Sequence, residues 1–269
     1  MATLRNLRNM LEAEVSVTHV QKICAYLSNE KAVLNSKQLP FRFLAAYREL
    51  KEVHSGYVSM VLNALEEAIT WSVANLKGFD EDTKVVVACD VSGSMQQPVS
   101  AKSKVLLYDI GLLLGMLLQS KCKNVITGMF GERWKTVALP SKNILANVDA
   151  FYKREGEVGY ATNGYLVIYD LMSRGYKADK IMMFTDTQLW STQPHAADAN
   201  IIAQWKAYKK MVPHAKLYLF DLSGYGKVPL QVESDDVYLI AGWSDKIFDV
   251  LRALEEGKNA LDMISKMEF

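Results

Sequence analysis

The sequence has few residues that bind soft metals or form cross-links. Its 269 residues include three cysteines and four histidines, and no two cysteines have CxxC spacing. Cys24, Cys89 and Cys122 each lie within an apolar run. This pattern argues against a disulfide framework or a zinc site and favours a reducing, cytoplasmic compartment.

Long apolar runs and a net charge of one sign are also missing. The most hydrophobic stretch, residues 105–118, contains Asp109 and is shorter than the roughly 20 residues that span a bilayer, so we expect a buried helix there. The N-terminus has no apolar core of a signal peptide, and we expect no membrane partner. The net charge of +1 gives no sign of a nucleic-acid partner. A hydrophobic content of 50% is typical of a globular protein.

The first 76 residues show helical periodicity. Apolar side chains recur at steps of three and four residues over 17–27, 40–50 and 57–76, and Ser16 can cap the first of these helices. Short polar joints connect them. We expect an all-α piece over 1–79, with its last helix packed between that piece and the rest of the chain.

From residue 80 the pattern changes to β-branched runs that alternate with helical stretches. Residues 84–90 form a continuous apolar run, which is typical of a strand buried on both faces of a parallel sheet. The alternation predicts an α/β domain over 80–269 with a doubly wound, mostly parallel sheet. We expect strands over 84–90, 124–130, 134–138, 180–185, 216–221 and 236–240, and helices over 103–119, 141–151, 163–173, 197–211 and from 246 onward.

Oxygen-bearing side chains follow two of these strands. Asp90, Ser92 and Ser94 leave the first strand at alternate positions, Asp186 follows the strand over 180–185, and Thr162 stands at the start of a helix. Ligands of such sheets bind beyond the carboxyl ends of the strands. Each residue alone is an ordinary turn or cap residue, but together they form an all-oxygen set. That set favours Mg²⁺, with Ca²⁺ or Mn²⁺ as alternatives.

The same residues carry a family resemblance. Val87-Ala-Cys-Asp-Val-Ser-Gly-Ser-Met95, Thr162 and Phe184-Thr-Asp186 resemble the metal-ion-dependent adhesion site of von Willebrand factor A domains, over residues 80–256. The resemblance implies that the two serines and the threonine contact the cation, and that the two aspartates do so directly or through water. It also implies an open metal position for an acidic side chain of a partner protein.

The helical part resembles a second family. Leu4-Arg-Asn-Leu-Arg-Asn-Met-Leu11 and Gln38-Leu-Pro-Phe-Arg-Phe-Leu-Ala-Ala-Tyr-Arg48 are similar to the end of the TROVE module of Ro autoantigens and their bacterial relatives. In that family the module is a ring of helical repeats that binds small Y RNAs outside and misfolded RNA ends through its hole. Only the last helices of such a ring are present, so one copy cannot close it. The resemblance implies a ribonucleoprotein component that binds a Y RNA-like partner in a longer context.

Five basic residues of the helical part are candidates for RNA contact. They are Arg5, Arg8, Lys37, Arg42 and Arg48. Phosphate contact and a solvated helical face explain them equally well, so both interpretations stay open.

An enzyme is the less favoured hypothesis. Asp90 would suit an aspartyl-phosphate nucleophile, but Ser92 stands where such enzymes usually have a second aspartate. No GxGxxG or GxxxxGK[ST] motif occurs. Asp221-Leu-Ser223 repeats half of the first motif and lies at the same expected sheet edge. We expect a non-catalytic interaction protein; the alternative to RNA binding is a stand-alone A domain that binds only a protein carboxylate.

Overall fold

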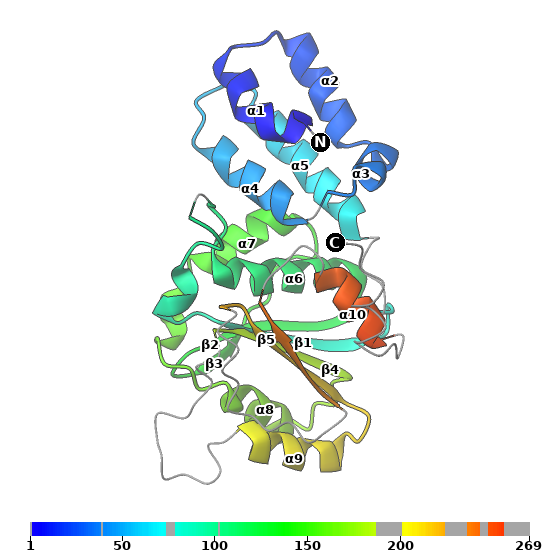
Figure 1. Ribbon diagram of the computed structural model, residues 1–269, viewed down its shortest axis with the longest axis vertical. Helices are drawn as coiled ribbons and strands as arrows, with labels where there is room; N and C mark the ends of the chain where they lie inside the picture. The colour runs from blue at the N-terminus through cyan, green and yellow to red at the C-terminus, as the bar shows by residue number, and fades with distance from the viewer. Residues whose placement is uncertain are drawn as a thin grey trace.

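The fold was obtained as a computed structural model, which describes residues 2–38, 40–73, 79–101, 103–186, 201–223, 236–242 and 247–255. A layer of helices from the N-terminal part stacks on an α/β sandwich (Figure 1). None of the described helices has the length and apolar character needed to cross a membrane.

The N-terminal layer contains two helices that the periodicity did not predict, α1 and α3. Ser16 stands at the N-terminus of α2, but its hydroxyl contacts His19 Nδ1 at 2.8 Å instead of a backbone N–H. Asn29 caps α3, since its side chain accepts a hydrogen bond from Ala32 N at 2.8 Å. The helices are α1 (Ala2–Glu12), α2 (Val17–Leu27), α3 (Glu30–Ser36), α4 (Pro40–Lys51) and α5 (Val58–Ser72).

The α/β part contains a six-stranded sheet in the order β3-β2-β1-β4-β5-β6. All neighbouring strands are parallel except β2 and β3, which confirms the expected doubly wound, mostly parallel fold. The strands are β1 (Lys84–Asp90), β2 (Asn124–Phe130), β3 (Trp134–Thr136), β4 (Lys180–Thr185), β5 (Lys216–Asp221) and β6 (Val237–Ala241).

Helices cover both faces of this sheet (Figure 1). Alternate residues of β1 face the two layers: Val85 and Val87 belong to the core shared with α6 and α7, while Val86 and Ala88 belong to the core shared with α8 and α9. One layer holds α6 (Leu107–Lys121), α7 (Ile144–Tyr152) and α10 (Ile247–Glu255), and the other holds α8 (Tyr165–Ser173) and α9 (Ile201–Met211).

The start of α6 differs from the expectation. The predicted helix from residue 103 begins at Leu107, because the preceding segment is extended and Leu106 forms a β-bridge with Pro98. Asp109 then closes the first turn by accepting a hydrogen bond from Leu106 N at 2.6 Å. The helices expected from 141 and 163 also begin later, at Ile144 and Tyr165.

The last N-terminal helix joins the two parts, as the sequence predicted. α5 packs against α2, α3 and α4 on one side and against α7 on the other. The Glu66 carboxylate accepts hydrogen bonds from Leu145 N at 3.0 Å and Ala146 N at 2.8 Å, in the first turn of α7. Burial raises the pKa of Glu66, although these two backbone donors oppose the shift.

Candidate metal centre and the basic helical face

Asp90 ends β1 with a fully buried carboxyl group. Ser92 N donates to its Oδ1 at 2.8 Å, and the Thr185 hydroxyl donates to its Oδ2 at 2.8 Å. Burial raises the pKa of Asp90 to about 6, against the lowering effect of these donors, and the charge of Asp186 adds to the rise. A nearby cation would relieve the cost of holding this carboxylate ionised.

The second carboxylate lies on the adjacent strand. β1 pairs with β2 on one side and with β4 on the other. The strand order therefore changes direction at β1, which is the switch point of the sheet. Asp186 directly follows β4 and is 6% exposed. In the turn after β1, Ser92 Oγ and Ser94 Oγ are 3.2 Å apart, and the N–H of Ser92 binds the Asp90 carboxylate.

Thr162 reaches the same edge through a contact between two loops. Asn163 N donates to Gly131 O at 3.0 Å, and Gly131 follows Phe130, the β2 residue paired with Asp90. A Cβ on Gly131 would lie 2.1 Å from the carbonyl oxygen of Gly159, so this approach requires a glycine. The structure thus places the five candidate residues Asp90, Ser92, Ser94, Thr162 and Asp186 at one end of neighbouring strands.

This donor set fits a hard divalent cation. It supplies two carboxylates and three hydroxyls, and adjacent ligands of an octahedral Mg²⁺ are about 3 Å apart, close to the separation of the two serine hydroxyls. Among the described residues, no three His, Cys, Asp or Glu side chains form a group that could hold a metal ion.

Two further residues support this edge and were missing from the predicted set. Thr185 binds Asp90 through its hydroxyl. The Ser223 hydroxyl donates to Asp221 Oδ1 at 2.8 Å and to the backbone oxygen of Asp186 at 3.3 Å. The repeated Asp-X-Ser pattern after β5 was the available signal for Ser223. The backbone N–H of Ser223 donates to Asp221 Oδ1, in the same way as the N–H of Ser92 donates to Asp90 Oδ1.

The five basic candidates differ in their exposure and in the ion pairs that they form. Arg5, Lys37 and Arg42 are exposed, and Lys37 ends α3 in a left-handed conformation. Arg8 is exposed but contacts Glu12 at 2.8 Å and Glu49 at 3.2 Å.

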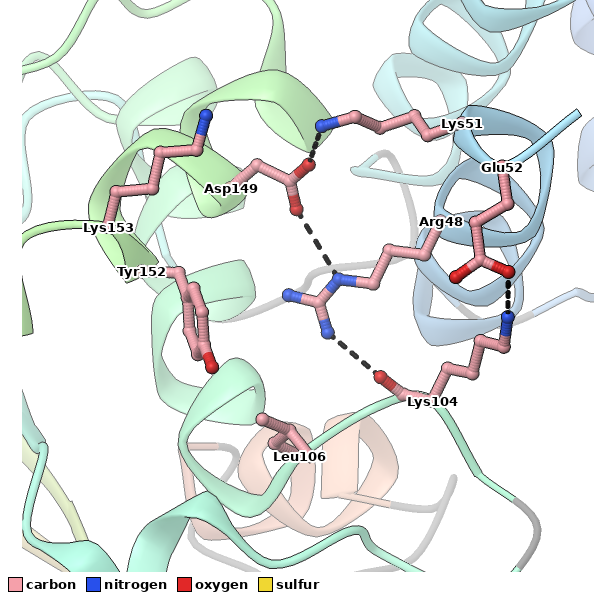
Figure 2. A pocket seen from close by; sticks show the side chains of 8 residues that line it. All are labelled: Arg48, Lys51, Glu52, Lys104, Leu106, Asp149, Tyr152 and Lys153. Atoms are coloured by element: carbon pink, nitrogen blue, oxygen red, sulfur yellow. Dashed lines mark hydrogen bonds and ion pairs between the residues drawn. The ribbon is translucent and has the colours of Figure 1, made fainter. Parts of the chain in front are cut away.

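Arg48 is committed to the contact between the two parts. Its guanidinium grips the buried Asp109 with both terminal nitrogens, Nη2 at 2.6 Å from Oδ1. It also donates to Asp149 Oδ1 at 3.4 Å and to Lys104 O at 3.0 Å (Figure 2). Its side chain is only 16% exposed. Arg48 therefore belongs to the contact between α4, α6 and α7 and adds little to the outer surface.

The comparison with protein families assigns the helical part. Residues 1–77 match the family model described as the TROVE domain. The helical part of the chain is therefore similar to a TROVE domain. The TROVE match ends within the segment that separates α5 from β1, close to the boundary expected from the change of pattern.

Two known proteins and one solved structure are similar to parts of this chain. Telomerase protein component 1 of Rattus norvegicus is 42% identical over 55 residues, and that of Mus musculus is 40% identical over 55 residues. These matches cover 20% of this chain and 2% of each relative. The Deinococcus radiodurans Ro protein has the same fold, with a TM-score of 0.71 and 20% identity. That match covers 95% of this chain and 52% of the Ro chain, so this chain spans about half of that protein's length.

Proposed function

We propose that this chain is a non-catalytic RNA-binding component of a ribonucleoprotein. The TROVE match over residues 1–77 carries this proposal, because the TROVE modules that these helices resemble bind small structured RNAs. The names of the similar proteins, telomerase protein component 1 and Ro protein, are consistent with such a particle. The partner is a small non-coding RNA of the Y RNA class in the full-length context.

The α/β part adds a second binding function. Ser92, Ser94 and Thr162 would hold a divalent cation through their hydroxyls, with Asp90 and Asp186 contacting it directly or through water. When bound, the cation supplies an electrophilic position that accepts a carboxylate from a partner protein. Thr185 and Ser223 keep Asp90 and the backbone of Asp186 in place.

Calorimetric titration with Mg²⁺ tests the metal site. Asp186→Ala and Ser94→Ala should abolish or strongly weaken binding while the far-UV circular dichroism spectrum stays native. Asp82→Ala is the matched control, since its carboxylate lies in the turn before β1 and is 90% exposed. A wild-type chain that binds no divalent ion at millimolar concentration would refute this part of the proposal.

Filter binding at physiological salt tests the RNA function. We expect this chain alone to bind RNA at about micromolar affinity, the range of non-specific contact. Reversing the exposed charges of Arg5 and Arg42 should remove most of this binding, whereas metal removal should change it little. Lys206→Glu, on the exposed side of α9, is the control. Nanomolar, sequence-selective binding would show that these few helices suffice, contrary to the proposal.

One observation favours the alternative of a metal-dependent protein-binding domain without RNA. Two of the five candidate cations, Arg8 and Arg48, already form ion pairs within the chain. Under this alternative the calorimetric titration succeeds and the filter-binding assay shows no retention of RNA at any salt concentration.

A further inference from the structure

Two separate segments of the chain carry the hydroxyls of the candidate metal centre. Ser92 directly precedes the short 3-10 helix η2 (Gly93–Gln96), and Ser94 lies within it. Thr162 follows a second 3-10 helix, η3 (Glu155–Val158), much later in the chain. Mg²⁺ requires near-ideal octahedral geometry. A cation held by all three hydroxyls therefore needs these two segments at a fixed separation.

Each segment is anchored to the rest of the α/β part. In η2, Met95 is fully buried and belongs to the core shared with α6. In η3, Val158 is also fully buried, and its carbonyl oxygen accepts a hydrogen bond from Arg133 N at 3.1 Å, in the loop after β2. These anchors tie each segment to the domain, and the separation of the two segments also depends on what joins them directly.

A side-chain hydrogen bond joins η2 to η3. Gln96 Nε2 donates to Glu155 Oε2 at 3.0 Å. Gln96 is the last residue of η2, two positions after Ser94, and Glu155 is the first residue of η3. Both residues are partly buried. Partial burial strengthens such a bond, because water competes less for the donor and the acceptor.

The charges around this contact are consistent with a cation nearby. The neighbouring carboxylate of Glu157 pairs with Arg154 and Lys135. Glu155 forms no ion pair with a described residue, and its partner is the neutral amide of Gln96. Burial raises the pKa of Glu155, so keeping this carboxylate ionised costs free energy. A divalent cation at the metal centre would offset that cost, because an opposite charge favours the ionised form.

We propose that Gln96 and Glu155 are positioning residues of the metal centre, which hold the two hydroxyl-bearing segments at the separation that a bound cation requires. This inference rests on the proposed function, because it needs a cation at these hydroxyls. Gln96 acts through the turn that carries Ser94, and Glu155 acts through the loop that carries Thr162. Loss of residues that orient metal ligands typically weakens metal affinity by about 10- to 100-fold. We expect the lower end here, since both residues act on backbone segments.

Calorimetric titration of the full chain with Mg²⁺ tests this role. Gln96→Ala removes the hydrogen bond without changing the net charge and should weaken Mg²⁺ binding about tenfold. Glu155→Ala should weaken it at least as much, whereas Glu155→Gln keeps an acceptor oxygen and should retain most of the affinity. Gln97→Ala is the matched control, since this neighbouring glutamine is exposed and lies outside the contact.

A second measurement separates positioning from a general loss of structure. In urea titrations without metal, Gln96→Ala should unfold at nearly the same urea concentration as the wild type. Added Mg²⁺ should then raise the urea midpoint of the wild type more than that of Gln96→Ala, because tighter binding to the folded state stabilises it more. The double variant Gln96→Ala/Glu155→Ala should bind Mg²⁺ no more weakly than Glu155→Ala alone, since both residues act through one contact.

Three results would overturn the inference in distinguishable ways. If the wild type and Gln96→Ala bind Mg²⁺ equally well, the positioning role is wrong while the metal site stands. If both Glu155 variants bind weakly and Gln96→Ala binds normally, the negative charge of Glu155 matters and the contact does not. A wild type that binds no divalent ion would refute the proposed metal site and this inference with it.

Discussion

Arg48 and Asp109 form an ion pair between residues 61 positions apart in the chain. Asp109 is fully buried, and burial raises its pKa, while the hydrogen bonds and charge of Arg48 oppose that rise. Asp109 also closes the first turn of α6 through Leu106 N. Removing one charge of this pair would leave the other largely buried without its partner, which is far more costly than the loss of an exposed pair.

Removing either partner should therefore destabilise the chain strongly. We expect Asp109→Ala or Arg48→Ala to cost about 3–5 kcal/mol in the free energy of unfolding, measured by urea titration. Arg42→Ala, an exposed arginine on the same helix, should cost at most about 0.5 kcal/mol. The double variant Arg48→Met/Asp109→Leu should recover much of the loss. If Arg48→Ala and Arg42→Ala are equally stable, the ion pair between Arg48 and Asp109 contributes nothing to the free energy of unfolding.

Strands were predicted better than helix starts, for a local physical reason. β1, β2, β4 and β5 match their expected ranges residue for residue, because a strand buried on both faces is apolar throughout and ends where polar residues begin. α6 begins at Leu107 because the bridge from Leu106 to Pro98 holds the preceding residues extended. That bridge joins two segments through backbone atoms. It therefore does not change the pattern of apolar and polar side chains from which helices are predicted.

The N-terminus of α7 is capped from another helix. Its first turn has no acidic residue, and Asn143 at the cap position makes no side-chain capping bond. Glu66 of α5 supplies both missing acceptor oxygens from 79 and 80 residues away. Such a cap cannot be predicted from the sequence around α7, since the partner is remote.

Glu66→Ala should loosen α7 and weaken its contact with α5. We expect a loss of about 1–3 kcal/mol in unfolding free energy, the cost of two unsatisfied N–H groups, and faster amide exchange at Leu145 and Ala146. Glu66→Gln keeps one acceptor oxygen and should lose less. Glu67→Ala, the neighbouring carboxylate outside this contact, is the control. Unchanged exchange at both amides in Glu66→Ala would contradict the capping role.

The N-terminal helices and the layer of α6 and α7 share one hydrophobic core. Leu44 of α4, Leu65 of α5, Leu113 of α6 and Val148 of α7 belong to a single cluster of buried apolar side chains. The sequence predicted the edge where Asp90 and Asp186 lie, because the carboxyl ends of parallel strands meet in any doubly wound sheet. It did not predict the ion pairs and the cavity where α4 meets α6 and α7, since these depend on how the three helices dock (Figure 2).

A chain that begins at residue 80 should lose the cover of this core. The faces of α6 and α7 that contact α4 and α5 would enter water, together with the cavity wall supplied by Arg48 and Lys51. We expect increased binding of a hydrophobic dye, lower solubility and a lower urea midpoint than in the full chain, which should unfold in one transition. Deleting only residues 1–14 is the comparison: it removes the buried leucines of α1 from α4 but leaves α4 and α5 covering α6 and α7, so its loss should be smaller. If the chain from residue 80 is as soluble as the full chain and unfolds at the same urea concentration, the two parts are independent domains and their shared core contributes nothing to stability.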